Sequence, residues 1–425
     1  MVEQHGKTLV PQIRFAGFTD PWEQRKLSEL VEIERGGSPR PIERYITDDP
    51  CGLNWVKIGD APELGRYITQ TTEKIKPEGL AKTRQVYPGD LVLSNSMSFG
   101  RPYIMAIRGC IHDGWLLIRD AQKHFDPIFL CHMLGAPQML NQYRMFAAGS
   151  TVNNLNKELV GKAIVSLPSK DEQREIGIVL DRLDSLITLH QRKYDKLCVL
   201  KKSMLDKMFP KGGSLYPEIR FAGFTDPWEQ RKLGELYKEV SEKNDLTYGR
   251  DRIISVAHMY FNPVVYVTED DYLKTYNVMR LGDIAFEGNR SKNFAHGRLV
   301  ENTIGDGIVS HVFKVFRPIQ PFDLMYWKYS INNEKAMKDV LTRSTKASTM
   351  MHELVAKDFL NEEIAVPSLE EQRRIGAFFD RLDSLITLHQ RKYDGCANPL
   401  FSERRISCRK PSHQNRCSAT TTPSG

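Results

Sequence analysis

The chain of 425 residues is 40% hydrophobic and 27% charged, which is ordinary for a soluble globular protein and allows two or three domains. It has no run of 18 apolar residues and no apolar signal core near its start, so we expect no transmembrane helix and a cytoplasmic location. The seven cysteines form no CxxC pair and no ligand cluster with histidine, which argues against a metal site. The net charge of +7 is only a weak indication of an anionic partner, because residues 395–425 contribute +4 of it.

The first recognisable element is a short anchor, IRFAGFTDPWEQRKL at residues 13–27, which recurs unchanged at residues 219–233. Each anchor precedes a variable segment, at 28–167 and 234–367, and then a helical segment that does recur. A repeat with a period of about 200 residues is too long for a solenoid. The order therefore predicts two copies of one domain, each followed by a rod.

The two variable segments share a layout although their sequences differ. Each has a Gly-Asp turn before an apolar run that is typical of a strand, then a helical pattern, a polar loop, a short helix and a brief strand. The turns with their strands lie at 86–97 and 279–290, the helical patterns at 125–145 and 322–341, the loops at 147–156 and 342–349, and the short helices near 157–163 and 351–360; further strands are expected at 251–258, 263–268 and 307–316. We predict an α+β fold class with two mixed α/β domains.

The rods are predicted at residues 168–210 and 368–394. Ser169 with Glu172, and Ser368 with Glu371, are capping-box signatures of a helix start. Behind each box a seam at spacings of four and three predicts a coiled coil. An ordinary amphipathic surface helix is the alternative, but residues 380–394 repeat residues 181–195 letter for letter. The seam residues are Ile176, Leu180, Leu183, Ile187, His190, Tyr194, Leu197, Lys201, Met204 and Met208 in the first rod and Ile375, Phe379, Leu382, Ile386, His389 and Tyr393 in the second.

His190 and His389 interrupt the two seams at equivalent positions. We interpret them as polar residues that help to fix the register of the helix pair, in preference to metal ligands.

At these repeats the chain resembles the specificity (S) subunits of type I restriction-modification enzymes. That family has two target-recognition domains separated by two near-identical helical conserved regions. The stretch Gly149–Lys157 (GSTVNNLNK), which comes before Leu-Pro-Ser and a Glu-Gln helix start, is similar to the family's domain-end motif. Phe15–Trp22 and Phe221–Trp228 also fit its opening pattern, and the resemblance covers about 394 of the 425 residues.

This plan divides the chain into seven parts. They are an N-terminal anchor (1–27), target-recognition domain 1 (28–167), conserved helix 1 (168–210), a linker with the repeated anchor (211–233), target-recognition domain 2 (234–367), conserved helix 2 (368–394) and a divergent tail (395–425).

The resemblance implies a DNA sequence-specificity subunit that performs no chemistry and reads a bipartite DNA site, with one domain for each half. The rods would form an antiparallel coiled coil; at ~1.5 Å per residue the first spans roughly 60 Å, enough for half-sites ~34 Å apart. They would also dock two modification (methyltransferase) subunits, which restriction (translocase and nuclease) subunits join. S-adenosylmethionine, ATP and Mg²⁺ would belong to those partners, and no cofactor to this chain.

The candidates for DNA contact follow from chemistry, because phosphates and base edges are bound mainly by Arg, Lys, Asn and Gln. For each candidate the alternative is a solvated surface charge. The loops 36–41 and 289–293 are preferred because they are polar and Gly-containing or basic beside predicted strands. The candidates are Arg35, Arg40, Lys57, Asn95, Arg101, Arg144, Asn153 and Asn154 in the first domain and Lys243, Asn289, Arg290, Lys292, Arg343 and Lys346 in the second.

The sequence carries no motif for catalysis. We find no GxxxxGK[ST] loop, no Asp/Asn-Pro-Pro-aromatic tetrad and no GxGxxG after a strand. Asn262–Val265 lacks the second Pro and the aromatic residue, which indicates a turn into a strand. We therefore expect no catalytic, cofactor-binding or metal-binding residues. A stand-alone sequence-specific DNA-binding regulator and an enzyme with an unrecognised active site stay open as alternatives.

The chain departs from the repeat after Asp394, where Gly395 and Pro399 should break the helix. The sequence beyond indicates a frame-shifted or recombined, disordered end; a genuine basic DNA-binding tail is the alternative. The lost turns would leave residues 176–183 of the first rod less covered. We therefore expect that restoring the continuation found after Asp195 raises the unfolding midpoint.

Overall fold

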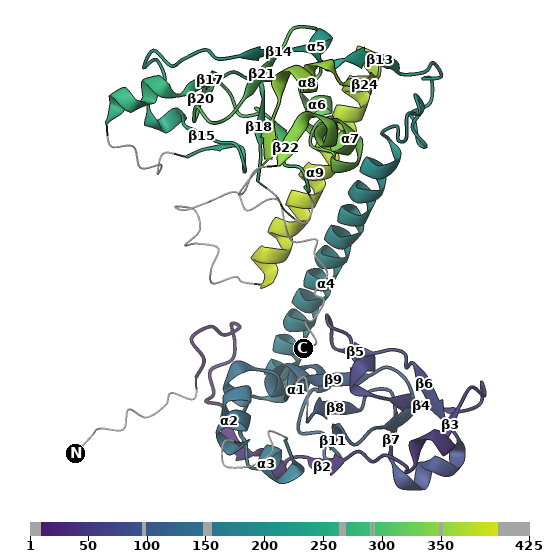
Figure 1. The fold of residues 1–425 in the computed structure, drawn as a ribbon. Helices are drawn as coiled ribbons and strands as arrows, with labels where there is room; N and C mark the ends of the chain where they lie inside the picture. The colour runs from purple at the N-terminus through teal and green to yellow at the C-terminus, as the bar shows by residue number, and fades with distance from the viewer. Residues whose placement is uncertain are drawn as a thin grey trace. The chain divides into compact units, whose positions relative to one another are not determined.

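The computed structural model describes residues 10–95, 99–147, 155–262, 269–289, 291, 294–347 and 352–397 (Figure 1). The chain divides into unit 1 (Met1–Leu189) and unit 2 (His190–Gly425). The division falls inside α4 (Lys170–Lys207). Among the helices in these ranges, none is long and apolar enough to cross a membrane.

Unit 1 combines two five-stranded sheets with three short helices. The first sheet has the order β3 (Ile46–Thr47), β6 (Glu73–Ile75), β4 (Leu53–Val56), β10 (Gly109–Ile111) and β7 (Arg84–Val86). The second has the order β2 (Glu32–Arg35), β11 (Trp115–Arg119), β8 (Leu91–Ser94), β9 (Pro102–Met105) and β5 (Tyr67–Ile68). The helices are α1 (Pro127–Leu134), α2 (Pro137–Ala147) and α3 (Lys157–Gly161), which Figure 1 shows beside the second sheet.

The strand β8 is apolar along its length because both of its faces are buried. Successive side chains of a strand point to opposite faces. Leu91 and Leu93 pack in the cluster that includes α1 and α2, whereas Val92 packs with Val56 and Ile111 of the first sheet. The second sheet is therefore the middle layer of unit 1.

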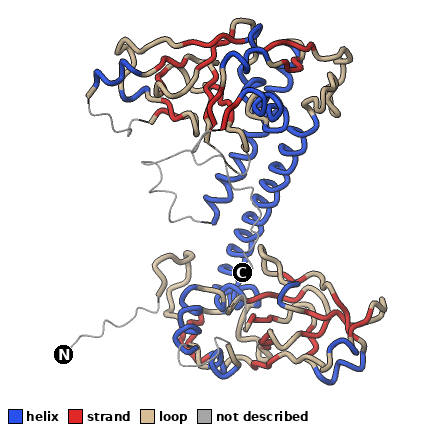
Figure 2. Tube along the Cα trace, viewed as in Figure 1, coloured by secondary structure: helices blue, strands red, loops and turns tan. Residues whose placement is uncertain are grey.

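Unit 2 repeats the plan with smaller sheets. Its main sheet has the order β14 (Tyr237–Val240), β21 (Val315–Pro318), β18 (Ile284–Glu287) and β19 (Arg298–Glu301). Two-stranded pairs are formed by β15 (Ile254–Ser255) with β16 (Tyr260–Phe261), β17 (Asn277–Met279) with β20 (Gly307–Val309), and β22 (Thr345–Ala347) with β23 (His352–Leu354). The helices are α5 (Leu233–Leu236), α6 (Leu324–Ser330), α7 (Glu334–Ser344), α8 (Ala356–Asn361) and α9 (Leu369–Ala397) (Figure 2).

Several element predictions need correction. Each long helical pattern is broken into two helices, because Gly135 ends α1 and the side chain of Asn333 caps a new helix, α7. The helix predicted near 351–360 begins only at Ala356, since His352–Leu354 pairs with β22 as a strand. The strand predicted at 307–316 is interrupted between β20 and β21, the strand at 251–258 is reduced to β15, and residues 263–268 lie outside the described residues.

The Gly-Asp turns predicted from the sequence are the same turn in both units. Asp90 N–H donates to Tyr87 O over 3.0 Å, and Asp283 N–H donates to Arg280 O over 3.0 Å. Gly89 and Gly282 take positive φ angles of 94° and 86°, which a type II turn requires at this position. Each turn thus starts its strand, β8 or β18, in the same register.

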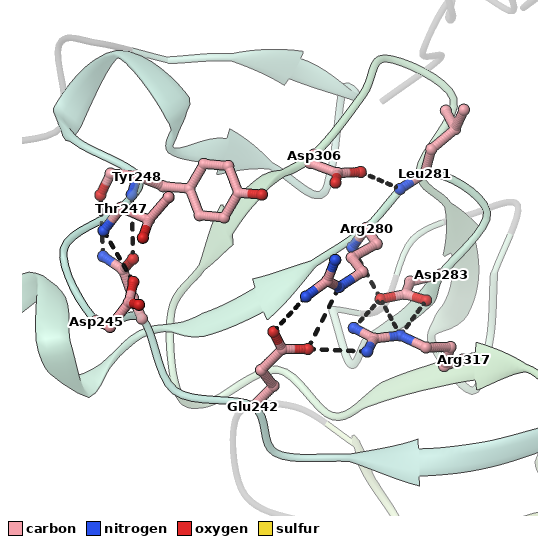
Figure 3. Close-up of polar contacts among 10 residues, drawn as sticks. Glu242, Asp245, Thr247, Tyr248, Arg280, Leu281, Asp283, Asp306 and Arg317 are labelled. Atoms are coloured by element: carbon pink, nitrogen blue, oxygen red, sulfur yellow. Dashed lines mark hydrogen bonds and ion pairs between the residues drawn. The ribbon is translucent and has the colours of Figure 1, made fainter.

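An arginine on the neighbouring strand holds the aspartate of each turn. In unit 2 Arg317 binds Asp283 over 3.0 Å and Glu242 over 2.8 Å, and Glu242 also binds Arg280 over 2.6 Å (Figure 3). Both arginines lower the pKa of Glu242, Arg280 most strongly. Arg119 and Asp90 form the weaker counterpart in unit 1, at 3.6 Å.

The anchors close each domain against its rod. The anchor strand β1 (Glu23–Lys26) pairs antiparallel with β12 (Ile164–Leu167), and β13 (Glu229–Lys232) pairs in the same way with β24 (Glu363–Val366). These two-stranded sheets end directly before α4 and α9. The repeated anchor is therefore a structural clasp.

The capping boxes form only in part. Ser169 Oγ accepts a hydrogen bond from Glu172 N–H at 3.4 Å, and Ser368 Oγ accepts one from Glu371 N–H at 3.3 Å. The Glu172 carboxylate does not return to the helix start: it binds Arg14 of the anchor through two hydrogen bonds of 2.6 and 2.7 Å. A buried carboxylate gains more from a bidentate guanidinium than from a neutral backbone donor.

Within unit 2, the second half of α4 lies antiparallel to α9. His190 contacts His389 with 3.0 Å between the Nδ1 atoms, and Lys201 Nζ lies 2.5 Å from Asp383 Oδ1, so contacts move back along α9 as α4 advances. The predicted seam residues Leu197, Met204, Met208, Ile375, Phe379 and Leu382 all pack in or against one cluster. In unit 1, Ile176 packs on the core of its own domain. The pairing predicted for the earlier turns of α4, up to Ile187, stays a prediction.

The second helix extends beyond its predicted end. α9 continues through Gly395 to Ala397, so Gly395 does not stop the helix at Asp394. A single glycine costs only about 1 kcal/mol in a helix, which the preceding turns can tolerate.

The histidine pair predicts a helix pair that weakens in mild acid. Burial, and then the charges of His190, Lys193 and Lys392, lower the pKa of His389 below its usual value. The native state therefore binds fewer protons at His389 than the unfolded state does. The contribution of neutral His389 to stability is complete above the unfolded pKa of about 6.5, and it is lost as pH falls through the folded pKa. Urea unfolding at pH 7.5 and 5.5 should show a smaller acid-induced loss for the double variant His190→Leu, His389→Leu. If the variant and the wild type lose equal stability, the pair is not the sensor.

The same double variant also tests the proposed register role of the two histidines. Unchanged helix register and complex stoichiometry in this variant would remove that role.

Candidate nucleic-acid interface

In each unit the loop after the Gly-Asp strand meets the polar loop that precedes the domain's last helix. In unit 1 Leu155 N–H donates to Asn95 O over 3.1 Å, and in unit 2 His352 N–H donates to Gly288 O over 2.9 Å. Counted from the Gly-Asp turns, Asn95 and Gly288 are equivalent positions. One backbone hydrogen bond therefore joins equivalent segments in both domains: the end of the Gly-Asp strand and the segment before α3 or α8.

The unit 1 interface is organised around Asp113, in the turn between β10 and β11. Ser38 Oγ donates to Asp113 Oδ1 over 2.9 Å, and Arg40 Nη2 lies 3.8 Å from Oδ2. Arg35 Nε and Asn95 Nδ2 donate to the backbone oxygen of Asp113 over 3.2 and 2.9 Å. Three predicted DNA-contact candidates, Arg35, Arg40 and Asn95, thus meet at one turn, together with Ser38.

The loop 36–41 is held close to the sheet by its backbone. Gly36 N–H donates to Trp115 O over 2.9 Å, and Gly37 N–H donates to Ile111 O over 3.2 Å. Asn95 is buried, so its side chain fixes the loop and does not face solvent. The Arg40 side chain, by contrast, is 83% exposed and carries a charge that Asp113 only partly balances.

The unit 2 interface lies where Gly288 approaches β23. A Cβ atom on Gly288 would lie 2.1 Å from His352 O, so only glycine permits this contact. The rings of His296 and His352 lie 5.2 Å apart, and Arg298 binds Glu287 over 2.6 Å. Asn289 is exposed directly beside this contact. The hairpin of β22 and β23, which carries the exposed Lys346, is therefore the neighbour of the loop that begins at Asn289.

The remaining candidates make other contacts or lie outside the described residues. Asn153, Asn154, Arg290 and Lys292 lie outside the described residues. Lys57 binds Glu73, Arg101 donates to Glu63 O, Arg144 donates to Asn141, Lys243 donates to Thr275 O and Asn277, and Arg343 binds Glu362 through both oxygens. Their roles as DNA contacts stay predictions.

Sequence reasoning missed Asp113, His296, Arg298 and His352. The available signal for Asp113 was the polar His112-Asp113-Gly114 turn between two apolar strands, which was not considered as a partner of the Gly36-Gly37 loop. No local pattern marked the unit 2 residues, because their proximity depends on the pairing of β22 with β23.

The buried thiols of unit 1 lack the character of nucleophiles. Burial raises the pKa of both Cys110 and Cys131 to about 11, so they are protonated near neutral pH. Burial, followed by the charge of Arg66, lowers the pKa of His132 to about 4, so this ring is neutral. Among the described residues, no group of three or more His, Cys, Asp or Glu side chains is arranged to hold a metal ion.

Comparison with known proteins finds one family model, the type I restriction modification DNA specificity domain, which matches residues 19–198 and again residues 225–395. The putative type I restriction enzyme MjaX specificity subunit of Methanocaldococcus jannaschii is 23% identical over 418 residues, covering 88% of this chain and 89% of that protein. The MjaVIII specificity subunit of the same organism is 20% identical over 399 residues, covering 88% of each. A crystal structure of the type I restriction-modification system S subunit from M. genitalium aligns with a TM-score of 0.49 and 13% identity, covering 92% of this chain and 96% of that one.

Proposed function

Because the chain belongs to the type I restriction-modification DNA specificity family, we propose that each of its two units reads one half of a bipartite DNA target. The chain is a non-catalytic DNA-specificity subunit with two recognition domains. Under this proposal the loop pairs at Asn95 and Gly288 face the two half-sites. Base-specific contacts then come from side chains on these loops, and phosphate contacts come from the surrounding Arg and Lys residues.

One observation carries the proposal: the two domains share a frame but differ in the residues placed on it. The Gly-Asp turn, its aspartate–arginine pair and the hydrogen bond that joins the loops recur in both units. Around that frame unit 1 presents Arg35, Ser38 and Arg40, whereas unit 2 presents Asn289, His296 and Lys346. With the same backbone frame, each domain can bind its DNA half-site in the same orientation. The different polar side chains can then recognise different bases.

The helices are the proposed docking surface for the catalytic partners. The seam residues from Leu197 onward pack within unit 2, but the outward faces of α4 and α9 are charged along their length. We assign to these faces the binding of two modification (methyltransferase) subunits, which restriction subunits then join. S-adenosylmethionine, ATP and Mg²⁺ would act in those partners.

Sequencing of methylated adenines in the source cell tests the function directly. Deletion of this gene should abolish methylation of one bipartite motif, and the chain should co-purify with a methyltransferase subunit. A stand-alone regulator would leave the methylated motifs unchanged and would not co-purify with a methyltransferase.

Arg40→Ala should weaken DNA binding without altering the fold. The side chain is 83% exposed, and a lost phosphate contact lowers affinity at low salt and reduces the slope of log K against log salt by about 0.9. Fluorescence anisotropy with the target duplex between 50 and 200 mM salt measures both quantities. Arg174→Ala is the matched control, because Arg174 is 60% exposed in its ion pair with Asp171 on α4. Equal salt slopes for the two variants would remove Arg40 from the interface.

A further inference from the structure

The end of α4 fills an aromatic pocket in unit 2. The Phe209 ring lies 6.3 Å from Trp228, 6.0 Å from Tyr326 and 6.1 Å from Phe379, measured between ring centroids. Phe209 and its neighbour Met208 are only 4% and 3% exposed. This pocket therefore has three walls: one from the anchor, one from α6 and one from α9.

Unit 1 contains the same three walls. By the repeat and the helix caps, Trp22 corresponds to Trp228, Phe129 to Tyr326, and Leu180 to Phe379. The anchor tryptophan meets the helix aromatic in the same edge-on way, at 6.5 Å for Trp22 and Phe129 and at 6.2 Å in unit 2. The pocket is thus built twice in this chain.

The anchor and α4 walls of unit 1 are more exposed than their counterparts in unit 2, whereas Phe129, at 4% exposed, is buried like Tyr326. Leu183 is 39% exposed, whereas its counterpart Leu382 is 5% exposed. Trp22 and Leu180 are half-buried, whereas Trp228 and Phe379 are 2% and 0% exposed. The greater exposure of Trp22, Leu180 and Leu183 is what is expected if no Met-Phe segment covers them in unit 1.

The sequence that follows the second rod does not repeat the Met-Phe segment that follows the first. The identical stretches end at Asp195 and Asp394. At the same distances beyond these residues, Met208 and Phe209 of the first copy correspond to Ser407 and Cys408 of the second. The repeat thus supplies two pockets and one matching helix end, and that helix end is used in unit 2.

We propose that the acceptor face of unit 1, formed by Trp22, Phe129, Ile176, Leu180 and Leu183, binds the end of an amphipathic helix from a separate polypeptide. The occupant has the chemistry of residues 197–210: apolar residues at helical spacing that end in Met-Phe-Pro. The same segment already docks on the equivalent walls in unit 2, which identifies what fits. The proposal does not depend on DNA recognition.

Affinity at the acceptor face must come from the apolar end and not from charge. In unit 2 Lys201 pairs with Asp383, but the equivalent Asp184 already lies 2.5 Å from Arg66 within unit 1. A lysine of the incoming helix would therefore add little. Burial of the apolar Met and Phe side chains supplies the driving force.

A labelled peptide with the sequence of residues 195–213, titrated with the full chain in the absence of DNA, tests the proposal by fluorescence anisotropy. We expect saturable binding, at least tenfold weaker binding of the peptide with Met208→Ala and Phe209→Ala, and less than a twofold change with Lys201→Ala. In the chain, Leu183→Asp should weaken binding at least tenfold. Ile178→Asp is the matched control, since Ile178 is 37% exposed and lies about 140° around the helix.

Three results would overturn the proposal. One is the absence of saturable binding, and another is equal affinity for the Leu183→Asp and Ile178→Asp chains when both retain the wild-type circular dichroism spectrum and melting temperature. The third is a dimer of the full chain in sedimentation that excludes the peptide, because a second copy would then be the occupant. A chain that binds the peptide but shows no DNA specificity would leave this inference standing and contradict only the proposed function.

Discussion

Phe209→Ala is expected to lower the free energy of unfolding of unit 2 by about 4 kcal/mol, in the range for a buried phenylalanine that leaves a cavity. The ring is 4% exposed and touches three aromatic side chains from three different elements. None of those walls can collapse easily, because Tyr326 and Phe379 lie in helices, and Trp228 directly precedes β13 and donates its backbone N–H to Leu215 O over 2.9 Å. Removing the ring therefore releases the end of α4 from the aromatic pocket of unit 2.

Denaturant unfolding monitored by tryptophan fluorescence measures this loss, since Trp228 forms part of the pocket. Val199→Ala is the control on the same helix: Val199 is 69% exposed, so its truncation should change stability by less than about 0.5 kcal/mol. A loss of the same size in both variants would show that the pocket does not hold the helix end.

Release of the helix end should also affect the spacing of the two readers under the proposed function. Asn333 Nδ2 donates to Leu205 O over 3.0 Å, and Lys335 binds Asp206, so the last turn of α4 is tied to α7 as well as to the pocket. We expect Phe209→Ala to reduce methylation of the bipartite site more than binding to a single half-site. If methylation of the bipartite site and binding to the half-site fall by the same factor, the variant affects folding and not the spacing of the two domains.

The repeated parts of the fold were predictable from sequence because a repeat compares the chain with itself. Identical residues at 13–27 and 219–233 marked the anchors, and the Gly-Asp pairs marked strand starts that the structure forms with positive-φ glycines. The breaks between α1 and α2 and between α6 and α7 were not predictable in detail, since apolar periodicity continues across Gly135 and Ile331. Tertiary packing decides where such a pattern is interrupted.

The candidate interface was predictable as loops but not as contacts. Arg35, Arg40 and Asn95 were selected for their chemistry, and the structure brings them to one residue, Asp113, that was not selected. Their meeting depends on the parallel pairing of β10 with β4 and the antiparallel pairing of β11 with β2 and β8, which no local pattern specifies. Sequence chemistry can propose such residues, whereas strand pairing decides which of them share a site.

The buried glutamates at the helix starts show the same limit and lead to the second large effect. Arg220→Met should destabilise unit 2 by about 3 kcal/mol, because it leaves a buried carboxylate without its partner. Arg220 binds Glu371 through hydrogen bonds of 2.7 and 2.8 Å, and the Glu371 side chain is only 1% exposed. The sequence indicated a capping role for this glutamate, so its partner in the anchor was missed.

Thermal and denaturant unfolding of three variants isolates this pair. Arg231→Met is the matched control, because Arg231 pairs with Glu235, whose side chain is 51% exposed, and an exposed pair contributes little. The double variant Arg220→Met, Glu371→Met should recover much of the lost stability, since it removes the buried charge together with its partner. If Arg220→Met is no more destabilising than Arg231→Met, the anchor does not hold the helix start through charge. In that case the strand pairing of β13 with β24 must act as the clasp by itself, and the same conclusion would extend to Arg14 and Glu172 in unit 1.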